Sequence, residues 1–226
     1  MRVAEVIGLP GAGKTTVVDL VGERLRTTVK LLPVTAIGGR GISGRLWATV
    51  RCPLVSAYLY GFVLFRKNVG LRHLLGIFSV QKRYLATFSG RFDRDLTVDE
   101  GVVHGMFSAV FGSLSTGLSN YFLRQLLAKL IDKGGIFYYL DIDKDTCVDR
   151  FRNRISGSRF STRHSAYLEE FMRCDFYKEL SKILSAEFPN RVFVKSSIDA
   201  MIDRLAEDFR SNGKDEVLSP IMVRLE

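Results

Sequence analysis

The sequence predicts an α/β fold in which helices cover both faces of a parallel β-sheet. Short apolar runs typical of buried strands alternate with segments of helical periodicity, and glycine- or proline-containing turns separate them. Hydrophobic residues make up 46% of the 226 residues, enough to build a core. Because strands that alternate with helices form parallel sheets buried on both faces, we expect three layers. Length favours one domain over residues 1–212, followed by a C-terminal tail over 213–226.

Each element of this fold follows from a local pattern. The expected strands are residues 2–8, 29–34, 96–98, 136–142 and 192–195. Apolar periodicity predicts helices over 14–25, 104–132, 146–154, 166–188 and 199–210, and two or three helices between 46 and 88 that break at Pro53 and near 68–70. Four glycines place a loop at 36–44.

Charge is distributed unevenly along the chain. Lys and Arg number 33 against 24 Asp and Glu, so the net charge is +9 at pH 7. Residues 24–92 contain twelve basic residues and no acidic one. Such a single-sign segment attracts anions. The alternatives at this point are a phosphorylated or carboxylated small molecule, nucleic acid and an acidic membrane surface.

Cysteine usage and hydropathy bear on the compartment. Cys52, Cys147 and Cys174 are odd in number and far apart, which fits neither a disulfide framework nor zinc-ligand spacing. We therefore expect a reduced, cytoplasmic location. Residues 53–65 are too few to cross a bilayer, and residues 101–123 carry several polar side chains, so a buried helix is the preferred interpretation of the second stretch.

A glycine-rich motif follows the first expected strand. Residues 8–15 read Gly-Leu-Pro-Gly-Ala-Gly-Lys-Thr and fit the pattern G-x-x-x-x-G-K-S/T. The glycines allow backbone N–H groups to approach phosphate oxygens, the lysine adds a positive charge, and the threonine hydroxyl suits Mg²⁺. A glycine-rich turn with an incidental lysine is the alternative. The predicted phosphate-binding residues are Gly8, Pro10, Gly11, Ala12, Gly13, Lys14, Thr15 and Thr16.

Two acids, Asp99 and Glu100, end the expected strand at 96–98. A carboxylate in this position beside a phosphate loop is suited to order Mg²⁺, and a second one can accept the proton of an acceptor hydroxyl. Asp99 is the metal candidate together with Thr15, although the roles of the two acids could be exchanged. The alternative is a pair of exposed carboxylates in a loop. His104 lies just beyond and is expected to pack in the fold, with a place in an acceptor pocket as the alternative.

Arginines cluster after the expected strand at 136–142. Arg150 and Arg154 are four residues apart and share one helix face, and Arg159 follows in a segment rich in Gly, Ser and Arg. Guanidinium groups can fork onto phosphate oxygens and neutralise charge on a transferring phosphoryl group. A solvated basic helix end is the alternative.

Together these three elements resemble the P-loop small-molecule kinases, the nucleoside/nucleotide-kinase-like group that includes thymidylate kinase and adenylate kinase. The loop also resembles that of adenylylsulfate kinase. The resemblance implies a P-loop NTPase fold with a five-stranded sheet in the order 2-3-1-4-5. It also implies ATP with Mg²⁺ as donor, an acceptor-binding helical segment at 36–95 and an arginine-bearing lid at 144–165. Carried over by position, the catalytic residues are Lys14, Asp99, Glu100, Arg150, Arg154 and Arg159.

The expected function is ATP-dependent phosphoryl transfer to a small anionic acceptor such as a nucleotide or nucleoside. The chain lacks the Arg-Glu-Pro segment of thymidylate kinases at 35–40 and the glutamate that deoxynucleoside kinases carry after the second strand. Alternatives are a sugar or lipid-linked acceptor, or a nucleotide-binding protein that docks to acidic membrane or nucleic acid. Nucleic acid is not the expected partner, whereas membrane-surface association and a homodimer through the apolar basic helices stay open.

Overall fold

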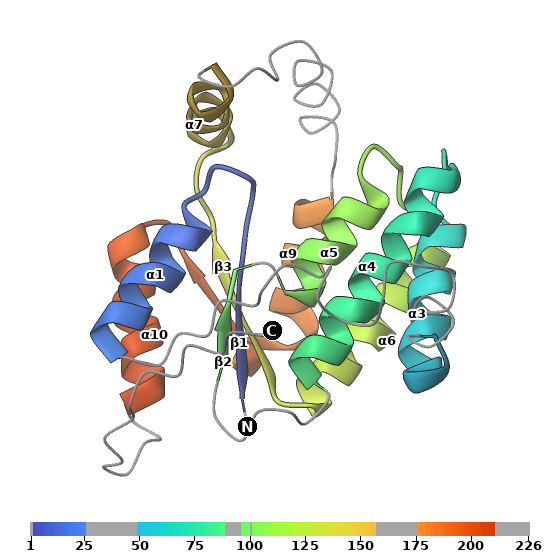
Figure 1. Cartoon of the computed structure of the whole chain (residues 1–226), viewed down its shortest axis with the longest axis horizontal. Helices are drawn as coiled ribbons and strands as arrows, with labels where there is room; N and C mark the ends of the chain where they lie inside the picture. Colours follow the sequence, from blue (N-terminus) through green and yellow to red (C-terminus); the bar gives the residue numbers. More distant parts are fainter. Residues whose placement is uncertain (1, 26–48, 89–95, 100, 157–175, 211–226) are drawn as a thin grey trace, which may run out of the picture.

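The computed structural model describes residues 2–25, 49–88, 96–99, 101–156 and 176–210 (Figure 1). Its centre is a parallel sheet of strands β1 (Val3–Ile7), β2 (Leu96–Val98), β3 (Gly135–Leu140) and β4 (Val192–Lys195), in the order β2-β1-β3-β4. Val3 is in register with Leu96 on one side and with Gly135 on the other, and Phe137 is in register with Val192. Because β1 lies between β2 and β3, the residues that follow these three strands meet at one edge of the sheet.

The expectation of five strands differs from this sheet, which has four within the described ranges. The missing strand was predicted at 29–34, which lies outside the described residues. The other four strands have the relative order that the resemblance implied. Their bounds agree to within two residues, and β4 begins and ends where the sequence predicted.

Helices α1 (Lys14–Leu25) and α10 (Ile198–Arg210) cover one face of the sheet, side by side (Figure 1). Val17 and Val21 of α1 meet Met201 and Leu205 of α10 in a core that also contains Val6 of β1. On each helix the two residues are four apart, so they lie on one face. This packing fixes the start of α1 relative to the sheet.

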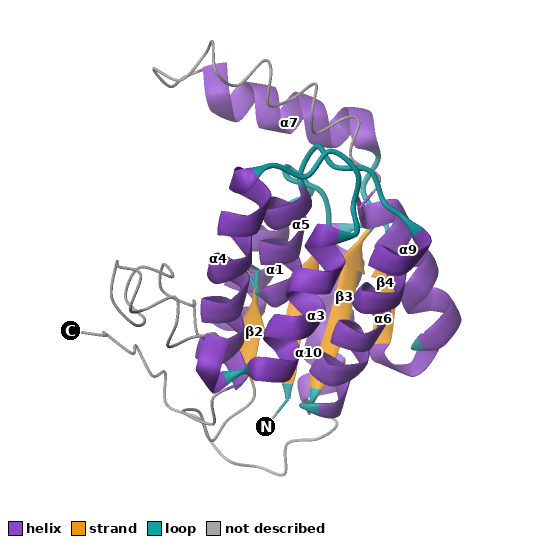
Figure 2. Ribbon diagram, turned by 90° about the vertical axis from the view of Figure 1, so that its right-hand side faces the viewer, coloured by secondary structure: helices purple, strands orange, loops and turns teal. Residues whose placement is uncertain are grey.

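Within the described residues, five helices lie on the other side of the sheet, some of them packed on other helices and not on the strands (Figures 1 and 2). They are α3 (Pro53–Leu64), α4 (Leu71–Phe88), α5 (Val102–Val110), α6 (Gly117–Asp132) and α9 (Phe176–Glu187). The aromatic rings of Phe107, Phe176 and Tyr177 pack with centroids 4.8 to 6.0 Å apart in the core beside Phe137 of the sheet. The breaks predicted in the segment 46–88 are present, because Pro53 is the first residue of α3 and Asn68 has a positive φ of 63°.

The single helix predicted over 104–132 is wrong, since the structure has α5 and α6 with a turn at 111–116 between them. Gly112 has a positive φ of 75°, which ends the first helix. Thr116 starts the second with a capping box, in which its hydroxyl accepts the Ser119 N–H while the Ser119 hydroxyl accepts the Thr116 N–H. Leu114 in this turn pairs with Lys67 through two backbone hydrogen bonds of 2.8 and 3.2 Å.

Helix α7 (Lys144–Ser156) stands over the carboxyl end of the strands (Figure 2). It extends the predicted helix at 146–154 by two residues at each end. The Asp143 carboxylate accepts the Thr146 N–H at 3.0 Å and so caps the helix start, and this hydrogen bond holds the pKa of Asp143 below its usual value. Of the helix predicted at 166–188, the described part is α9, which is followed by the short 3₁₀ helix η2 (Pro189–Arg191). Within the described ranges, none of the helices combines the length and apolar character needed to cross a bilayer.

Candidate active site

The segment between β1 and α1 is a tight loop with three positive-φ glycines. Gly8 has φ 152°, Gly11 φ 86° and Gly13 φ 98°. A Cβ on Gly11 would collide with the carbonyl oxygen of Cys147, and a Cβ on Gly13 would lie 2.7 Å from Cδ1 of Ile198. Both positions therefore require glycine for conformation and for space.

The loop leads directly into the N-terminus of α1. The Val17 N–H donates to the Gly13 carbonyl at 3.0 Å, the first helical bond, so the N–H groups before it have no helical acceptor. Together with the helix dipole, such N–H groups attract anions. The predicted phosphate-binding segment thus has the backbone geometry that a phosphate chain needs.

The Lys14 side chain folds over the loop. Its Nζ donates to the carbonyl oxygens of Gly8 and Leu9, each at 3.0 Å, and the residue is 9% exposed. The ammonium group is thereby held at the glycine bend, where an anion lying along the loop would meet it.

Thr15 and Asp99 lie in direct contact although they are 84 residues apart in the chain. The Thr15 hydroxyl donates to Oδ2 of Asp99 at 2.6 Å. Thr15 is in the first turn of α1 and Asp99 follows β2, so the adjacent parallel strands bring both to the same edge of the sheet. A hydroxyl and a carboxylate oxygen are ligands that Mg²⁺ accepts. Among the residues that the structure describes, no group of three or more His, Cys, Asp or Glu forms a metal cage. The pair therefore fits a Mg²⁺ that takes its remaining ligands from phosphate and water.

These residues surround a cavity of about 390 Å³. Its lining consists of Pro10, Gly11, Gly13, Lys14, Thr15, Thr16, Asp99, His104, Arg150, Phe151 and Ile198. Of the predicted site residues outside the lining, Gly8 accepts the lysine hydrogen bond and Ala12 is buried in the core between α1 and α10. Glu100, Arg159 and the side chain of Arg154 lie outside the described residues, so their roles stay predictions.

Glu5 is a buried acid next to this cavity that the sequence interpretation did not single out. It is 3% exposed, and its Oε1 accepts the N–H of His104 at 3.0 Å. A side chain on Gly101 would collide with the carboxylate, so the glycine allows Glu5 to cap the start of α5 from a different element. Burial raises the pKa of Glu5 to about 7, opposed by the N–H bonds from His104 and Val103 and by the charge of Arg83. The sequence signal that could have identified Glu5 is an acidic residue at the centre of an apolar strand.

His104 lies in the first turn of α5 with its side chain in the cavity lining. Its buried Nδ1 has no hydrogen-bond partner in the part of the chain that the structure describes. Burial, followed by the charges of Lys14 and Arg83, lowers its pKa to about 3. The imidazole is therefore neutral at physiological pH. His104 lines the cavity beside the glycine loop, and its place in an acceptor pocket stays a prediction.

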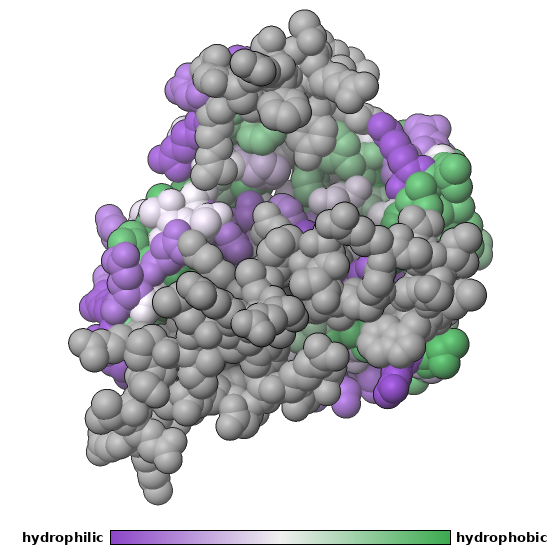
Figure 3. All heavy atoms as spheres, in the orientation of Figure 1, coloured by the Kyte–Doolittle hydropathy of each residue, from purple (hydrophilic) through white to green (hydrophobic). Residues whose placement is uncertain are grey.

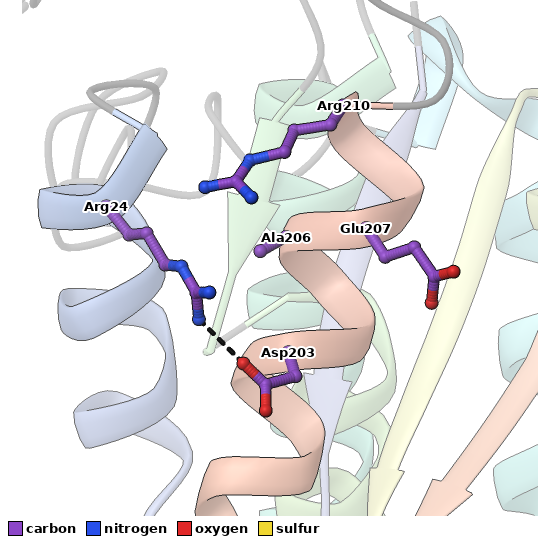
Figure 4. Close-up of a pocket in the computed structure, with 5 residues that line it drawn as sticks. All are labelled: Arg24, Asp203, Ala206, Glu207 and Arg210. Carbon is purple, nitrogen blue, oxygen red and sulfur yellow. Dashed lines mark hydrogen bonds and ion pairs between the residues drawn. The ribbon is translucent and has the colours of Figure 1, made fainter.

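A second hollow, of about 520 Å³, lies between the C-terminal ends of α1 and α10 (Figure 4). Arg24 crosses it to Asp203 at 2.7 Å, and Ala206, Glu207 and Arg210 complete its lining. Helix C-termini carry a negative partial charge that disfavours anions. We therefore assign no phosphate chemistry to this hollow.

No protein-family model and no curated protein matches the chain. Among solved structures, it is similar to deoxyadenosine kinase from M. mycoides with bound dATP, at TM-score 0.49 and 12% identity over 93% of this chain and 100% of that one. The same kinase with dCMP and dCDP matches at TM-score 0.48 and 16% identity over 93% and 99%. Shikimate kinase from Bacteroides thetaiotaomicron matches at TM-score 0.41 and 14% identity over 92% and 98%. Each of these solved structures is of a kinase. Similarity at this level says nothing about the activity of this chain.

Proposed function

We propose that the protein is an ATP-dependent kinase that transfers a phosphoryl group to a small, anionic acceptor such as a nucleotide or nucleoside. The observation that carries the proposal is the 2.6 Å hydrogen bond from Thr15 to Asp99 directly below the glycine loop. This contact joins a phosphate-binding backbone to a carboxylate that can order Mg²⁺. A glycine-rich turn with an incidental lysine would not require that contact.

On the donor side, the N–H groups at the start of α1 bind the phosphate oxygens of ATP. Lys14, which bonds the carbonyls of Gly8 and Leu9, would turn to the β and γ oxygens, and the Thr15 hydroxyl and Asp99 carboxylate would hold Mg²⁺. A Mg²⁺ held there would supply positive charge that neutralises the phosphates and favours displacement at phosphorus.

On the acceptor side, the proposal uses the helical segment 36–95, of which α3 and α4 are described. Glu100 orients the acceptor hydroxyl or takes its proton while Asp99 serves Mg²⁺, or the two acids exchange these roles. Arg150 lines the cavity from α7, the described part of the lid at 144–165. With Arg154 and Arg159 it would close over the phosphoryl group and exclude water.

We place all of this machinery in one domain over residues 1–212. A reduced, cytoplasmic compartment suits the buried thiols of Cys52 and Cys147.

The test is phosphoryl transfer from labelled ATP·Mg²⁺ to a panel of nucleosides, nucleoside monophosphates, sugars and sugar phosphates. Lys14→Ala should abolish turnover, whereas Lys133→Ala, at an exposed site after α6, should not. Thr15→Val removes the hydroxyl at constant shape and should lower turnover by about 100-fold or more, while Thr15→Ser should retain most of it.

Two results would contradict the proposal. ATP loss that is equal with and without every acceptor would indicate a nucleotide-binding hydrolase instead of a kinase. Normal turnover in Lys14→Ala would remove the role of the loop.

A further inference from the structure

Two neighbouring turns expose a group of large apolar side chains. In the turns between α3 and α4 and between α5 and α6, and in the helix ends beside them, six such residues are 44 to 73% exposed. We call this group the tip patch, and it comprises Leu64, Phe65, Leu71, Leu114, Leu118 and Tyr121. Exposed apolar residues gathered at one place mark interaction surfaces more often than scattered ones do.

The two turns form one surface, because hydrogen bonds and ring contacts tie them together. Lys67 and Leu114 pair through both of their backbone hydrogen bonds, and the Thr116 hydroxyl donates to the carbonyl of Phe65. The rings of Phe65 and Phe122 stack at 5.6 Å. The patch is therefore preformed.

Its charge is positive. Lys67 in the turn between α3 and α4 and Arg72 at the start of α4 are exposed, and no acidic residue occurs anywhere in the described segment 49–88. Glu179, which reaches this turn from α9, is 3.1 Å from the guanidinium of Arg66 and is neutralised by it. In Figure 3, hydrophobic side chains lie next to hydrophilic ones at the upper right, where Figure 1 shows the two turns.

We propose that the tip patch docks the protein on an acidic lipid surface. Leu and aromatic side chains enter the interfacial layer while Lys67 and Arg72 contact anionic headgroups. A second copy of the chain fits less well, because its tip patch carries the same positive charge, whereas an acidic lipid surface carries the opposite charge. Figure 1 shows the two turns at the same end of the molecule as the phosphate loop and α7, so docking turns that end toward the bilayer.

The test is co-sedimentation of the full chain with vesicles of phosphatidylcholine, with and without phosphatidylserine. Binding should require phosphatidylserine and should weaken at high salt. Lys67→Glu reverses one charge, a change of about 2 kcal/mol at an acidic surface, so the partition constant should fall about 30-fold. Leu118→Ser should lower it about tenfold.

Matched controls distinguish an effect of the tip patch on vesicle binding from a general effect of changing the charge or hydropathy of the protein. Lys133→Glu repeats the charge reversal at an exposed site after α6, and Leu20→Ser repeats the apolar loss on α1, where Leu20 is 41% exposed. Both should bind like wild type. The proposal is overturned if wild type does not sediment with acidic vesicles, if it binds neutral vesicles equally well, or if the controls weaken binding as much as the patch variants. A concentration-dependent dimer in sedimentation velocity that Leu118→Ser dissociates would assign the patch to a second copy and also overturn it.

Discussion

The substitution Glu5→Gln tests the buried carboxylate that supports the start of α5. Glutamine keeps the shape of the side chain and an oxygen that can accept the His104 N–H, 3.0 Å away. It removes only the ability to ionise. Because Glu5 is 3% exposed, solvent screening of this effect is small.

The expected magnitude follows from the pKa. Burial raises the pKa of Glu5 from 4.5 to about 7, so between these values the unfolded chain loses a proton that the folded protein keeps. The contribution of Glu5 to the free energy of unfolding therefore falls as pH rises from about 4.5 to about 7 and is constant above. A shift of about 2.5 pKa units corresponds to about 3 kcal/mol.

The assay is urea unfolding of wild type and Glu5→Gln between about pH 4.5 and pH 8. The variant should gain stability relative to wild type as pH rises, reaching about 3 kcal/mol near pH 8. The exposed Glu23 supplies the control, and Glu23→Gln should show no such trend. A difference in unfolding free energy between wild type and Glu5→Gln that does not change with pH, or that changes in the opposite direction, would contradict a raised pKa for Glu5.

Three further outcomes are expected. Arg66→Met leaves the carboxylate of Glu179 unpaired at 14% exposure and should cost about 3 to 5 kcal/mol in urea unfolding, part of which Glu179→Gln should restore in the double variant. Gly11→Ala places a Cβ against the carbonyl oxygen of Cys147 and should weaken ATP binding in calorimetry at least about tenfold; unchanged affinity would show that the loop is not the binding element. Because burial and neighbouring cations lower the pKa of His104 to about 3, the pH profile of turnover in His104→Asn should keep the wild-type shape, and loss of an inflection near neutrality would contradict this.

Much of the fold could be predicted because its signals are local. The strand at Val192–Lys195 is an apolar run that follows a Pro-Asn turn, and the breaks at Pro53 and Asn68 arise from the residues themselves. The contact between Thr15 and Asp99 could also be predicted. The carboxyl ends of parallel strands lie at the same edge of the sheet; Thr15 follows the loop after β1, and Asp99 directly follows β2.

The features that the sequence did not predict depend on tertiary structure or on polar residues inside apolar runs. Apolar residues at helical spacing continue on both sides of 111–116, so this pattern does not reveal the turn between α5 and α6. The local signals for the turn are Gly112 and the capping pair Thr116 and Ser119. Glu5 lies in an apolar strand, and its hydrogen-bond partner His104 is 99 residues away in the chain. A pattern within a short stretch of sequence therefore cannot predict this hydrogen bond.

The most direct test of the account is the crystal structure of the protein with Mg²⁺ and a non-hydrolysable ATP analogue. We expect the triphosphate along residues 8–15, Lys14 moved from the carbonyls of Gly8 and Leu9 to the phosphates, and Mg²⁺ beside Thr15 and Asp99. A nucleotide bound elsewhere, or a loop that keeps the lysine on its own carbonyls at saturating nucleotide, would contradict it.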